Sequence, residues 1–235
     1  MAPNDAGLAT RERILDAAMA LAGREGMARL TTRRVAGEAG VNVGLLHYHF
    51  GSKDDLVRAV LERWQADIRE VLDRAARTAA EERPAAGDEE ILVAALGACL
   101  DYSFARPGLV FGVAGMIVSD MEGRVGGGAA PEGRPDDGAT SPGIPPFPPA
   151  LPIGPLQYVL QGRILPLLRS RLGGDEVLVS RRALQLFASV FHPALFTPLT
   201  SLVFGLDLSD KASRDAYVRG VVANALAPPR PKGRP

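Results

Sequence analysis

Apolar residues recur along most of the chain at intervals of three and four, the spacing that places side chains on one face of an α-helix. The pattern begins after Thr10, a residue suited to cap a helix, with apolar positions at Ile14, Leu15, Ala18, Leu21 and Ala22. Gly26 is expected to end this first helix, and residues 1–9 are expected to form a disordered tail. Because the period-two alternation of strands is scarce, the chain is predicted to be all-α.

The stretch "TTRRVAGEAGVNVGLLHYHFGSKDDL" predicts two short helices joined by a tight turn, followed by the start of another helix. Thr31 or Thr32 is expected to cap the first short helix, and Gly40 can take the left-handed conformation that ends it. Asn42 is a suitable cap for the second short helix, which is expected to reach about His49.

A longer helix is expected from a cap at Ser52 to about Ala76, with acidic residues in its first turn where the helix dipole favours them. Helical patterns continue over residues 89–106, 108–123, 156–173, 175–204 and from about 209 onward. The pattern therefore predicts three helices within residues 10–55, followed by a larger C-terminal helical bundle over residues 56–227.

One segment of this bundle cannot contribute to a core. Residues 122–155 contain nine prolines and eight glycines, so this segment is expected to be a flexible loop. Both a functional lid and plain disorder agree with this composition. The C-terminal residues 228–235, "PPRPKGRP", are expected to form a disordered tail.

Charge and cysteine content narrow the class of protein only slightly. Lys+Arg and Asp+Glu both total 27, so binding to nucleic acid must be argued from local placement and not from net charge. The single cysteine, Cys99, excludes an internal disulfide and is expected to be a buried small hydrophobe. No signal peptide is visible, and the most apolar run, Leu109–Val118, is too short to span a bilayer. A soluble cytoplasmic protein is expected.

Two helices joined by a glycine-containing turn are typical of a helix-turn-helix, whose second helix enters the major groove of DNA. In such a helix a narrow apolar strip, here Val41, Leu46 and Phe50, must hold the helix to the core. The remaining side chains then form a contact face of Asn42, Val43, Gly44, Leu45, His47 and Tyr48.

The chemistry of these side chains fits DNA. Asn42 can hydrogen-bond to a base edge or a phosphate, and Val43 and Leu45 can contact thymine methyl groups. Gly44 would permit a close approach of the backbone. Phosphate contacts are expected from the polar or charged side chains of Thr32, Arg33, His47, Tyr48 and Lys53.

The same residues allow other interpretations. Many helical hairpins bind nothing, so the pattern alone does not settle DNA binding. A metal site at His47 and His49 is not expected, because residues two apart on a helix point roughly 200° apart. A structural hydrogen bond near the core is the expected role of His49.

The segment "TRERILDAAMALAGREGMARLTTRRVAGEAGVNVGLLHYHFGSKDDLVRAVL" resembles the DNA-binding region of the TetR family of bacterial transcriptional regulators. The most diagnostic pieces are "LTTRRVAGEAGV", the Gly44 turn and "HYHFGSKDDL". This chain departs from the family in having His47 for a common tyrosine, Leu45 for a common threonine and Gly51 where proline or a polar residue is frequent.

The resemblance implies that residues 10–55 form a three-helix helix-turn-helix DNA-binding head and residues 56–227 a helical body for ligand binding and dimerisation. It also implies a homodimer that binds a palindromic double-stranded DNA operator, with a small-molecule inducer bound in the body. The helix that starts at Ser52 would link the head to the body, and inducer binding would release the operator. The function expected from the resemblance is therefore a ligand-responsive repressor. A TetR-like activator and a regulator that acts without a ligand remain open alternatives.

The resemblance leaves the inducer and the pairing surface undefined. The candidate residues of an inducer pocket are Tyr102, Phe104, Phe111, Met116, Tyr158, Phe187, Phe191 and His192, although plain core packing is the favoured explanation for any single one of them. The expected dimer seam, with a monomer core as the alternative, comprises Leu178, Leu184, Leu186, Phe187 and Val190 of 177–191 and Tyr217, Val218, Val221, Val222 and Leu226 of the last helix.

An enzyme with a helical body is the competing function class. It would need converging acid, base or nucleophilic groups, and the spacing supports no Ser-His-Asp set, phosphate-cradling glycine loop or metal set. His192 is the only histidine of the body. The chain is therefore expected not to be an enzyme, and no cofactor is expected.

Overall fold

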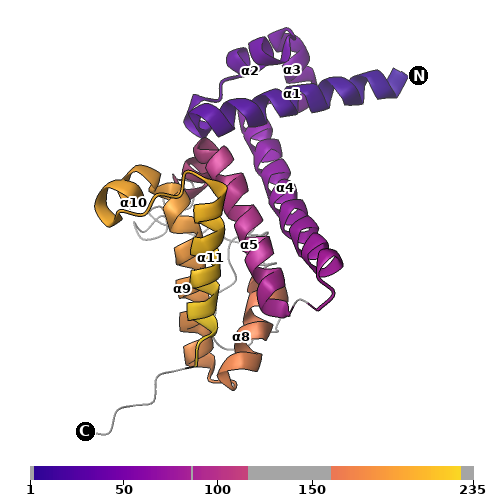
Figure 1. Ribbon diagram of the computed structural model, residues 1–235. Coiled ribbons are helices and arrows are strands. Elements are labelled where there is room, and N and C mark those ends of the chain that lie inside the picture. Colours follow the sequence, from indigo (N-terminus) through magenta and orange to yellow (C-terminus); the bar gives the residue numbers. More distant parts are fainter. Residues whose placement is uncertain (1–2, 86, 116–159, 229–235) are drawn as a thin grey trace, which may run out of the picture.

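Every regular element in the described part of the chain is helical. The computed structural model describes residues 3–85, 87–115 and 160–228, and no strand occurs within these ranges (Figure 1). In chain order the elements are α1 Pro3–Glu25, the short η1 Met27–Arg29, α2 Thr32–Ala39, α3 Val43–Phe50, α4 Lys53–Glu82, α5 Asp88–Ala105, a helical segment 107–115, the π-helical turn η2 Leu160–Ile164, α8 Leu165–Leu172, α9 Glu176–Leu195, α10 Thr197–Phe204 and α11 Lys211–Leu226. The all-α prediction is confirmed, whereas the loop expected at 122–155 lies outside the described residues.

The first helix begins earlier than the apolar pattern predicts. It starts at Pro3, within the region expected to be a disordered tail, and Thr10 is an interior residue whose hydroxyl donates to the Ala6 carbonyl at 2.9 Å. A proline suits the first turn of a helix because its missing N–H would have no partner there. This extension projects beyond the rest of the head, and its Leu8 is 56% exposed (Figure 1).

Side-chain caps define the starts of the next helices. Thr31 accepts a hydrogen bond from the Arg34 N–H at 3.3 Å, and Asn42 accepts one from the Leu45 N–H at 2.7 Å. Ser52 does the same for the Asp55 N–H at 3.1 Å. Because such bonds satisfy N–H groups that the helix leaves without a partner, these starts follow from local sequence.

The buried side chains form two clusters that meet along α4. The head cluster combines α1, α2 and α3 with Leu56 and Val60 of α4. The body cluster combines Ile68 and Leu72 of α4 with α5, α8, α9 and α11, while Trp64 packs against both clusters. The two clusters therefore meet near Trp64, in the middle of α4.

Helix α4 connects the two ends of the molecule. It runs without interruption from Lys53 to Glu82, beyond the expected end near Ala76, and Figure 1 shows it descending from the head along the body. A continuous helix of this kind transmits a rotation of one end to the other. Movement of its C-terminal half against α5 would therefore move the head.

A second contact between head and body involves close backbone packing. The segment 107–115 lies against the end of α1, and Leu109 is fully buried in the head cluster. A Cβ atom added to Gly108 would lie 2.3 Å from the Ala22 carbonyl oxygen and 2.6 Å from the Gly26 nitrogen. Only glycine fits at position 108 while the two backbones remain this close.

Polar contacts join α1, α4 and α5 at the same junction. The guanidinium of Arg63 on α4 contacts Glu12 and Asp16 of α1 at 2.9 and 3.3 Å, and Asp67 at 3.1 Å. The Tyr102 hydroxyl of α5 donates to Asp67 at 3.1 Å, and burial followed by the nearby Asp67 charge raises the pKa of Tyr102. The hydroxyl therefore stays protonated and able to donate.

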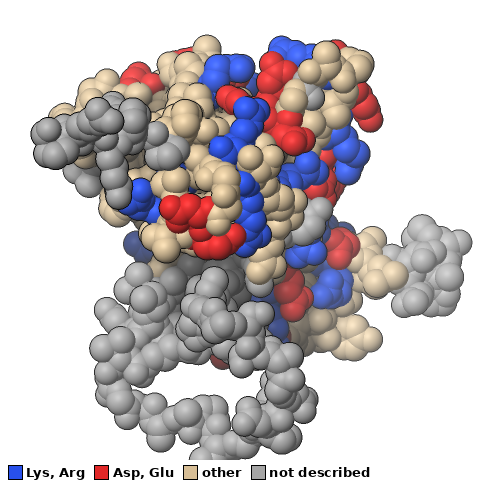
Figure 2. Space-filling model, turned by 90° about the horizontal axis from the view of Figure 1, so that it is seen from below, with Lys and Arg blue, Asp and Glu red and all other residues tan. Residues whose placement is uncertain are grey.

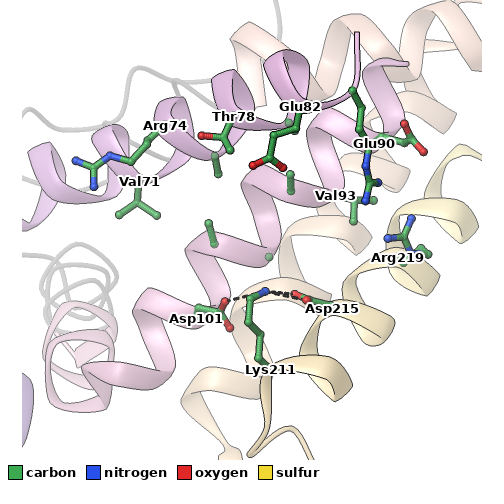
Figure 3. Close-up of a pocket in the computed structure, with 16 residues that line it drawn as sticks. Val71, Arg74, Thr78, Glu82, Glu90, Val93, Asp101, Lys211, Asp215 and Arg219 are labelled. Atoms are coloured by element: carbon green, nitrogen blue, oxygen red, sulfur yellow. Dashed lines mark hydrogen bonds and ion pairs between the residues drawn. The ribbon is translucent and has the colours of Figure 1, made fainter. Parts of the chain in front are cut away.

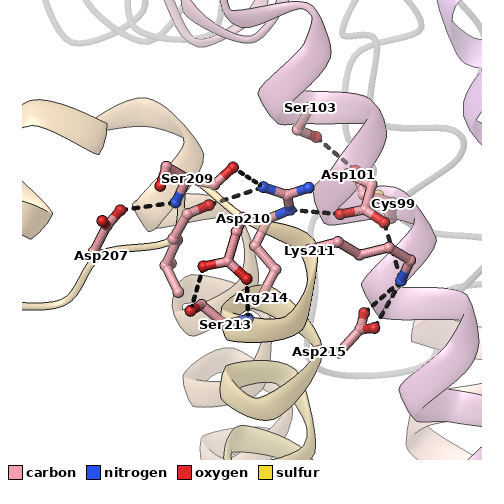
Figure 4. Close-up of polar contacts among 11 residues, drawn as sticks. Cys99, Asp101, Ser103, Asp207, Ser209, Asp210, Lys211, Ser213, Arg214 and Asp215 are labelled. Carbon is pink, nitrogen blue, oxygen red and sulfur yellow. Dashed lines mark hydrogen bonds and ion pairs between the residues drawn. The ribbon is translucent and has the colours of Figure 1, made fainter.

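The start of α11 is held to α5 by charged groups (Figure 4). Arg214, of which only 13% of the side chain is exposed, donates to Asp101 at 2.5 Å and to the Leu208 and Ser209 carbonyls. Lys211 pairs with Asp215 at 2.7 Å and with Asp101 at 3.5 Å. The cations of α11 near Asp101 are thus already neutralised within the fold.

The helix expected over 175–204 is divided in two. The Phe196 backbone leaves the helical region, with φ −122° and ψ 34°, between α9 and α10. A proline in the first turn of α10 lacks the N–H that would continue the α9 ladder. As a result α10 projects from the body, and Leu202 and Phe204 are 84% and 76% exposed (Figure 1).

The single cysteine of the chain, Cys99, is buried in the body cluster. Burial raises the pKa of the Cys99 thiol to about 12, which makes this residue an unreactive part of the core.

Seen from the end away from the head, basic and acidic side chains are intermixed over the described surface (Figure 2). None of the described helices has the length and apolar character needed to cross a membrane.

Candidate nucleic-acid interface

The connection between α2 and α3 is a tight turn built from local hydrogen bonds. Gly40 takes the left-handed conformation, with φ 65° and ψ 35°, and the Val41 N–H donates to the Ala36 carbonyl at 2.9 Å. Val41 is half-buried against the head cluster. A left-handed glycine followed by backbone hydrogen bonds to the last turn is a common way for a helix to end. Here it sets the direction in which α3 leaves α2.

Helix α3 is held to the head by a narrow strip and exposes the rest of its surface. Leu46 and Phe50 are buried, as the spacing predicts. Leu45 is only half-buried, and the exposed residues are Asn42, Val43, Gly44, His47 and Tyr48. Tyr48 is 82% exposed, which is unusual for a large aromatic side chain without a packing role.

The geometry narrows what Asn42 can do. Its side-chain oxygen already accepts the Leu45 N–H at 2.7 Å, so its amide NH₂ remains available as a donor. Recognition of adenine through both amide atoms would require breaking the cap. A Cβ atom at Gly44 would lie 3.2 Å from this oxygen, so Gly44 also leaves room for the cap.

The His47 ring is oriented by a backbone acceptor. Its Nδ1 lies 2.7 Å from the Gly51 carbonyl oxygen, which requires that Nδ1 carry the hydrogen. In the neutral ring Nε2 is then an acceptor, so the expected bond to a phosphate oxygen requires the protonated imidazolium. A neutral His47 can instead accept a hydrogen bond from a base amino group.

His49 does not have the structural hydrogen bond expected for it. It is half-buried, and its ring packs edge-on against Tyr48 with centroids 5.2 Å apart. No hydrogen bond to this ring occurs within the described residues. The contact supports the position of Tyr48 on the exposed side of α3.

Two unpaired cations flank α3. Arg33 near the start of α2 and Lys53 at the start of α4 are exposed, and neither forms an ion pair or hydrogen bond with any described residue. Their neighbours differ, because Arg34 pairs with Glu25 at 2.7 Å and Arg58 pairs with Asp55 at 2.7 Å. Helix starts also offer backbone N–H groups to an anion, so both cations stand where a phosphate is favoured.

The polar groups around these cations are largely engaged within the head. Thr32, the remaining expected phosphate contact, is half-buried. The hydrogen bond from the Ser52 hydroxyl, followed by contacts with Arg58, holds the pKa of Asp55 below its usual value. Arg33 and Lys53 are therefore the cations of this region most available to a ligand.

The residues expected to line an inducer pocket do not converge within the described structure. Met116 and Tyr158 lie outside the described residues. Tyr102 is buried at the α4–α5 junction, Phe111 is 51% exposed, and Phe104 lies under the Arg214 guanidinium. These positions belong to different helix faces, which the sequence pattern could not distinguish.

The remaining aromatic candidates lie on α9. Phe187 and Phe191 pack against each other with ring centroids 4.7 Å apart, and His192 packs against Phe196 at 4.5 Å. His192 borders a cavity of about 340 Å³ between α9, α10 and α11, together with Ser189 and Tyr217. Of the described candidates, His192 alone borders one of the described cavities.

A larger groove lies where no site was expected. It has a volume of about 580 Å³ and runs between the C-terminal half of α4, α5 and α11 (Figure 3). Its floor consists mainly of Ala75, Ala79, Ala94, Gly97 and Ala98. The sequence signal for this groove was not a cluster of aromatic residues. It was the four-residue spacing of small residues, Ala75 with Ala79 and Ala94 with Ala98, which leaves space between neighbouring helices.

The expected dimer seam proves to be partly core. Within the single chain six of its members are buried: Leu178, Leu186, Val190, Val218, Val222 and Leu226. Leu184 is 66% exposed, and Val177 in the same range is 78% exposed. The others, Phe187, Tyr217 and Val221, are half-buried, and Tyr217 donates its hydroxyl hydrogen to the Ser189 carbonyl at 2.7 Å.

Similarity to known proteins is concentrated in the head. Residues 14–60 match the family described as "Bacterial regulatory proteins, tetR family". Over 62 residues, 26% of this chain, it is 40% identical to the HTH-type transcriptional dual regulator CecR of Shigella flexneri. It is 34% identical over 58 residues, 25% of the chain, to the HTH-type transcriptional regulator BetI 2 of Chromohalobacter salexigens. Over 69 residues, 29% of the chain, it is 35% identical to the regulator BetI of Brucella canis.

The same alignments leave most of the body without a counterpart. The chain spans only 27%, 28% and 35% of the lengths of the CecR, BetI 2 and BetI relatives, respectively. The matched region ends within α4, close to the point where the head cluster gives way to the body cluster.

Proposed function

We propose that the chain is a regulator of the TetR family, whose model matches residues 14–60, and that it is a cytoplasmic repressor that binds a palindromic operator as a homodimer and is released by a small-molecule inducer. Proteins of this class are DNA-binding regulators and not enzymes. The observation that carries the proposal is the exposed face of α3 around Tyr48, with the unpaired cations Arg33 and Lys53 on its flanks.

The proposed docking places α3 in the major groove. Val43 and Leu45 would meet thymine methyl groups, while His47 and the Asn42 amide would reach base edges. Arg33 and Lys53 would meet the phosphates that border the groove. This arrangement uses the free amide donor of Asn42 and the free ring nitrogen of His47 without breaking the Asn42 cap or the contact between His47 and Gly51.

Dimerisation is proposed through the outward faces of α9 and α11, which contact each other within the chain. On α9 this face contains Val177, Leu184 and Ala188, all exposed. On α11 it contains the exposed small residues Ala216, Gly220 and Ala223. Small side chains allow two such helix pairs to approach closely, and the resulting four-helix packing would bury the apolar side chains that the single chain leaves in water.

The proposed switch acts through α4. An inducer releases DNA only if it binds the non-binding arrangement of the heads more tightly than the binding arrangement. Because α4 carries Lys53 at its start and body-core residues such as Leu72 further along, a displacement in the body changes the spacing of the two heads. Heads that no longer match successive major grooves cannot bind together.

Footprinting of the purified protein on DNA from upstream of its own gene tests the proposal. We expect protection of two symmetric half-sites about 34 Å apart and two chains per site. Leu184→Glu should produce a monomer with much weaker binding, whereas Leu202→Glu, on the projecting α10, should leave pairing intact. A wild-type protein that protects no DNA, or a L184E protein that remains dimeric, would contradict the proposal.

Two apolar side chains of α3, the exposed Val43 and the half-buried Leu45, should determine sequence preference. Val43→Ala and Leu45→Ala remove methyl groups proposed to contact thymine, so each should reduce discrimination at one base pair by about 1 kcal/mol. Binding to unrelated DNA should stay unchanged because neither residue is charged. Competition binding with a library of operator variants measures this, and an unaltered preference in both variants would rule out the assigned contacts.

A further inference from the structure

We propose that the groove between α4, α5 and α11 binds a small zwitterionic molecule, one with an ammonium group, a carboxylate group and an apolar chain between them. The volume of about 580 Å³ lies within the range of small-molecule sites. The binding step does not depend on the DNA-binding proposal. Its regulatory consequence, given below, rests on the proposed function.

The floor of the groove suits an apolar chain. Ala75 and Ala79 of α4 face Ala94 and Ala98 of α5, and Val93 adds a buried aliphatic side chain. None of these floor residues offers a polar side-chain atom. A ligand that covers this surface therefore removes apolar area from water without burying an unpaired polar group of the protein.

The walls of the groove carry unpaired charges of opposite sign. Glu82 extends into the groove from α4, and Arg219 lies on the α11 side (Figure 3). Neither forms an ion pair or hydrogen bond with any described residue, so they are too far apart to neutralise each other. Glu90 and Arg83 add one further charge of each sign to the lining.

These charges discriminate between ligand classes. A simple cation could pair with Glu82 but would form no ion pair with Arg219, and a simple anion would do the reverse. The remaining charged residues of the lining are already engaged, since Lys211 pairs with Asp215 at 2.7 Å and with Asp101 at 3.5 Å, and Arg74 pairs with Glu70. A molecule with one charge of each sign satisfies both walls at once.

The site has a direct route to the head. Glu82 and the alanines of α4 belong to the same continuous helix that carries Lys53, whereas Arg219 belongs to the body. A bound zwitterion would link the two and restrain α4 against α11. If the proposed function holds, such a ligand changes operator affinity by favouring one position of α4.

Calorimetric titration with ω-amino fatty acids of six, eight and ten carbons tests the site, because this series covers different separations of the two charges. The matched comparisons are the fatty acid and the alkylamine of each length. At the best length we expect the zwitterion to bind about three-fold more tightly than either singly charged analogue, the size expected for one exposed ion pair. Trp64, the single tryptophan, provides a fluorescence reading of the head–body junction.

Variants that remove one charge test which residue binds the ammonium end of the ligand and which binds its carboxylate end. Glu82→Gln should abolish the preference over the fatty acid, and Arg219→Gln should abolish the preference over the alkylamine. Glu81→Gln and Arg77→Gln are matched controls, since both residues are exposed on α4 and do not line the groove. Ala98→Leu fills the floor and should weaken binding of the whole series, with thermal unfolding confirming that the variant is folded.

The outcomes separate this inference from the proposed function. The inference is overturned if no member of the series binds, if a singly charged analogue binds wild type as tightly, or if the control variants change binding as much as E82Q and R219Q. Operator binding without ligand is measured in parallel. Selective zwitterion binding by a protein that binds no operator would uphold the site and reject the proposed function.

Discussion

Replacing Arg33 and Lys53 together with alanine should weaken operator binding by roughly a thousand-fold at about 0.1 M salt. Each subunit would lose two phosphate contacts, and the dimer therefore about four. Each contact releases about 0.9 of a counterion on binding, so the slope of log affinity against log salt should fall by about 3.6. Fluorescence anisotropy with a labelled operator over a range of salt concentrations measures both quantities.

The matched control for this prediction is Arg34→Ala. Arg34 is adjacent to Arg33 and carries the same charge, but it pairs with Glu25, and its hydrogen bond is the main cause of the lowered pKa of that carboxyl. Its replacement should change the salt slope far less, because its charge is already engaged. If the R34A variant loses as much affinity as R33A, general surface charge and not a specific phosphate contact would explain the binding.

The second large effect is expected at Gly108. Alanine at this position places a Cβ atom 2.3 Å from one backbone atom of α1 and 2.9 Å from another, the carbonyl oxygens of Ala22 and Gly23. Neither atom can move without displacing a helix, so Gly108→Ala should lower the free energy of unfolding by about 3 kcal/mol. Denaturant titration, followed by circular dichroism, measures this loss.

Other glycines of the same segment provide graded controls. Gly115→Ala should be neutral or slightly stabilising, because nothing lies within 4 Å of the added atom. Gly112→Ala should have an intermediate effect. The added atom would lie 2.2 Å from Met27 Cγ, which a rotamer change can move, and 2.8 Å from Met27 Cβ, which moves only with the backbone. Equal effects of G108A and G115A would mean that the segment 107–115 does not pack closely against α1.

The parts of the head that were foreseen depend on interactions between near neighbours in sequence. The caps at Thr31, Asn42 and Ser52 each join residues three apart, and the left-handed turn at Gly40 requires only a residue without a Cβ atom. Such features can be predicted from a short stretch of chain. The same local reasoning placed Tyr48 in solvent, because the inward strip of α3 was already occupied by Leu46 and Phe50.

Which side chains have an ion-pair or hydrogen-bond partner could be learned only from the three-dimensional structure. Arg33 and Arg34 are equivalent in sequence, and only the position of Glu25 on α1 makes one free and the other paired. Likewise, the orientation of His47 depends on the Gly51 carbonyl beyond the end of α3. Periodicity carries no information about such partners.

In the body, local pattern and spatial arrangement diverged further. Leu184 and Leu186 were both assigned to the dimer seam, yet they lie two residues apart on α9 and point to nearly opposite sides, so one is exposed and the other buried. An apolar pattern does not distinguish a residue of the monomer core from a residue of an interface. The groove at Ala75 and Ala98 arises only when α4 and α5 pack side by side. The chain's own residues were therefore sufficient for most of its helices, for its caps and for the exposed face of α3, which depend on interactions between near neighbours in sequence. Its cavities, ion pairs and exposed apolar helix faces depend on how helices that are far apart in sequence pack together. Only the tertiary structure shows this packing.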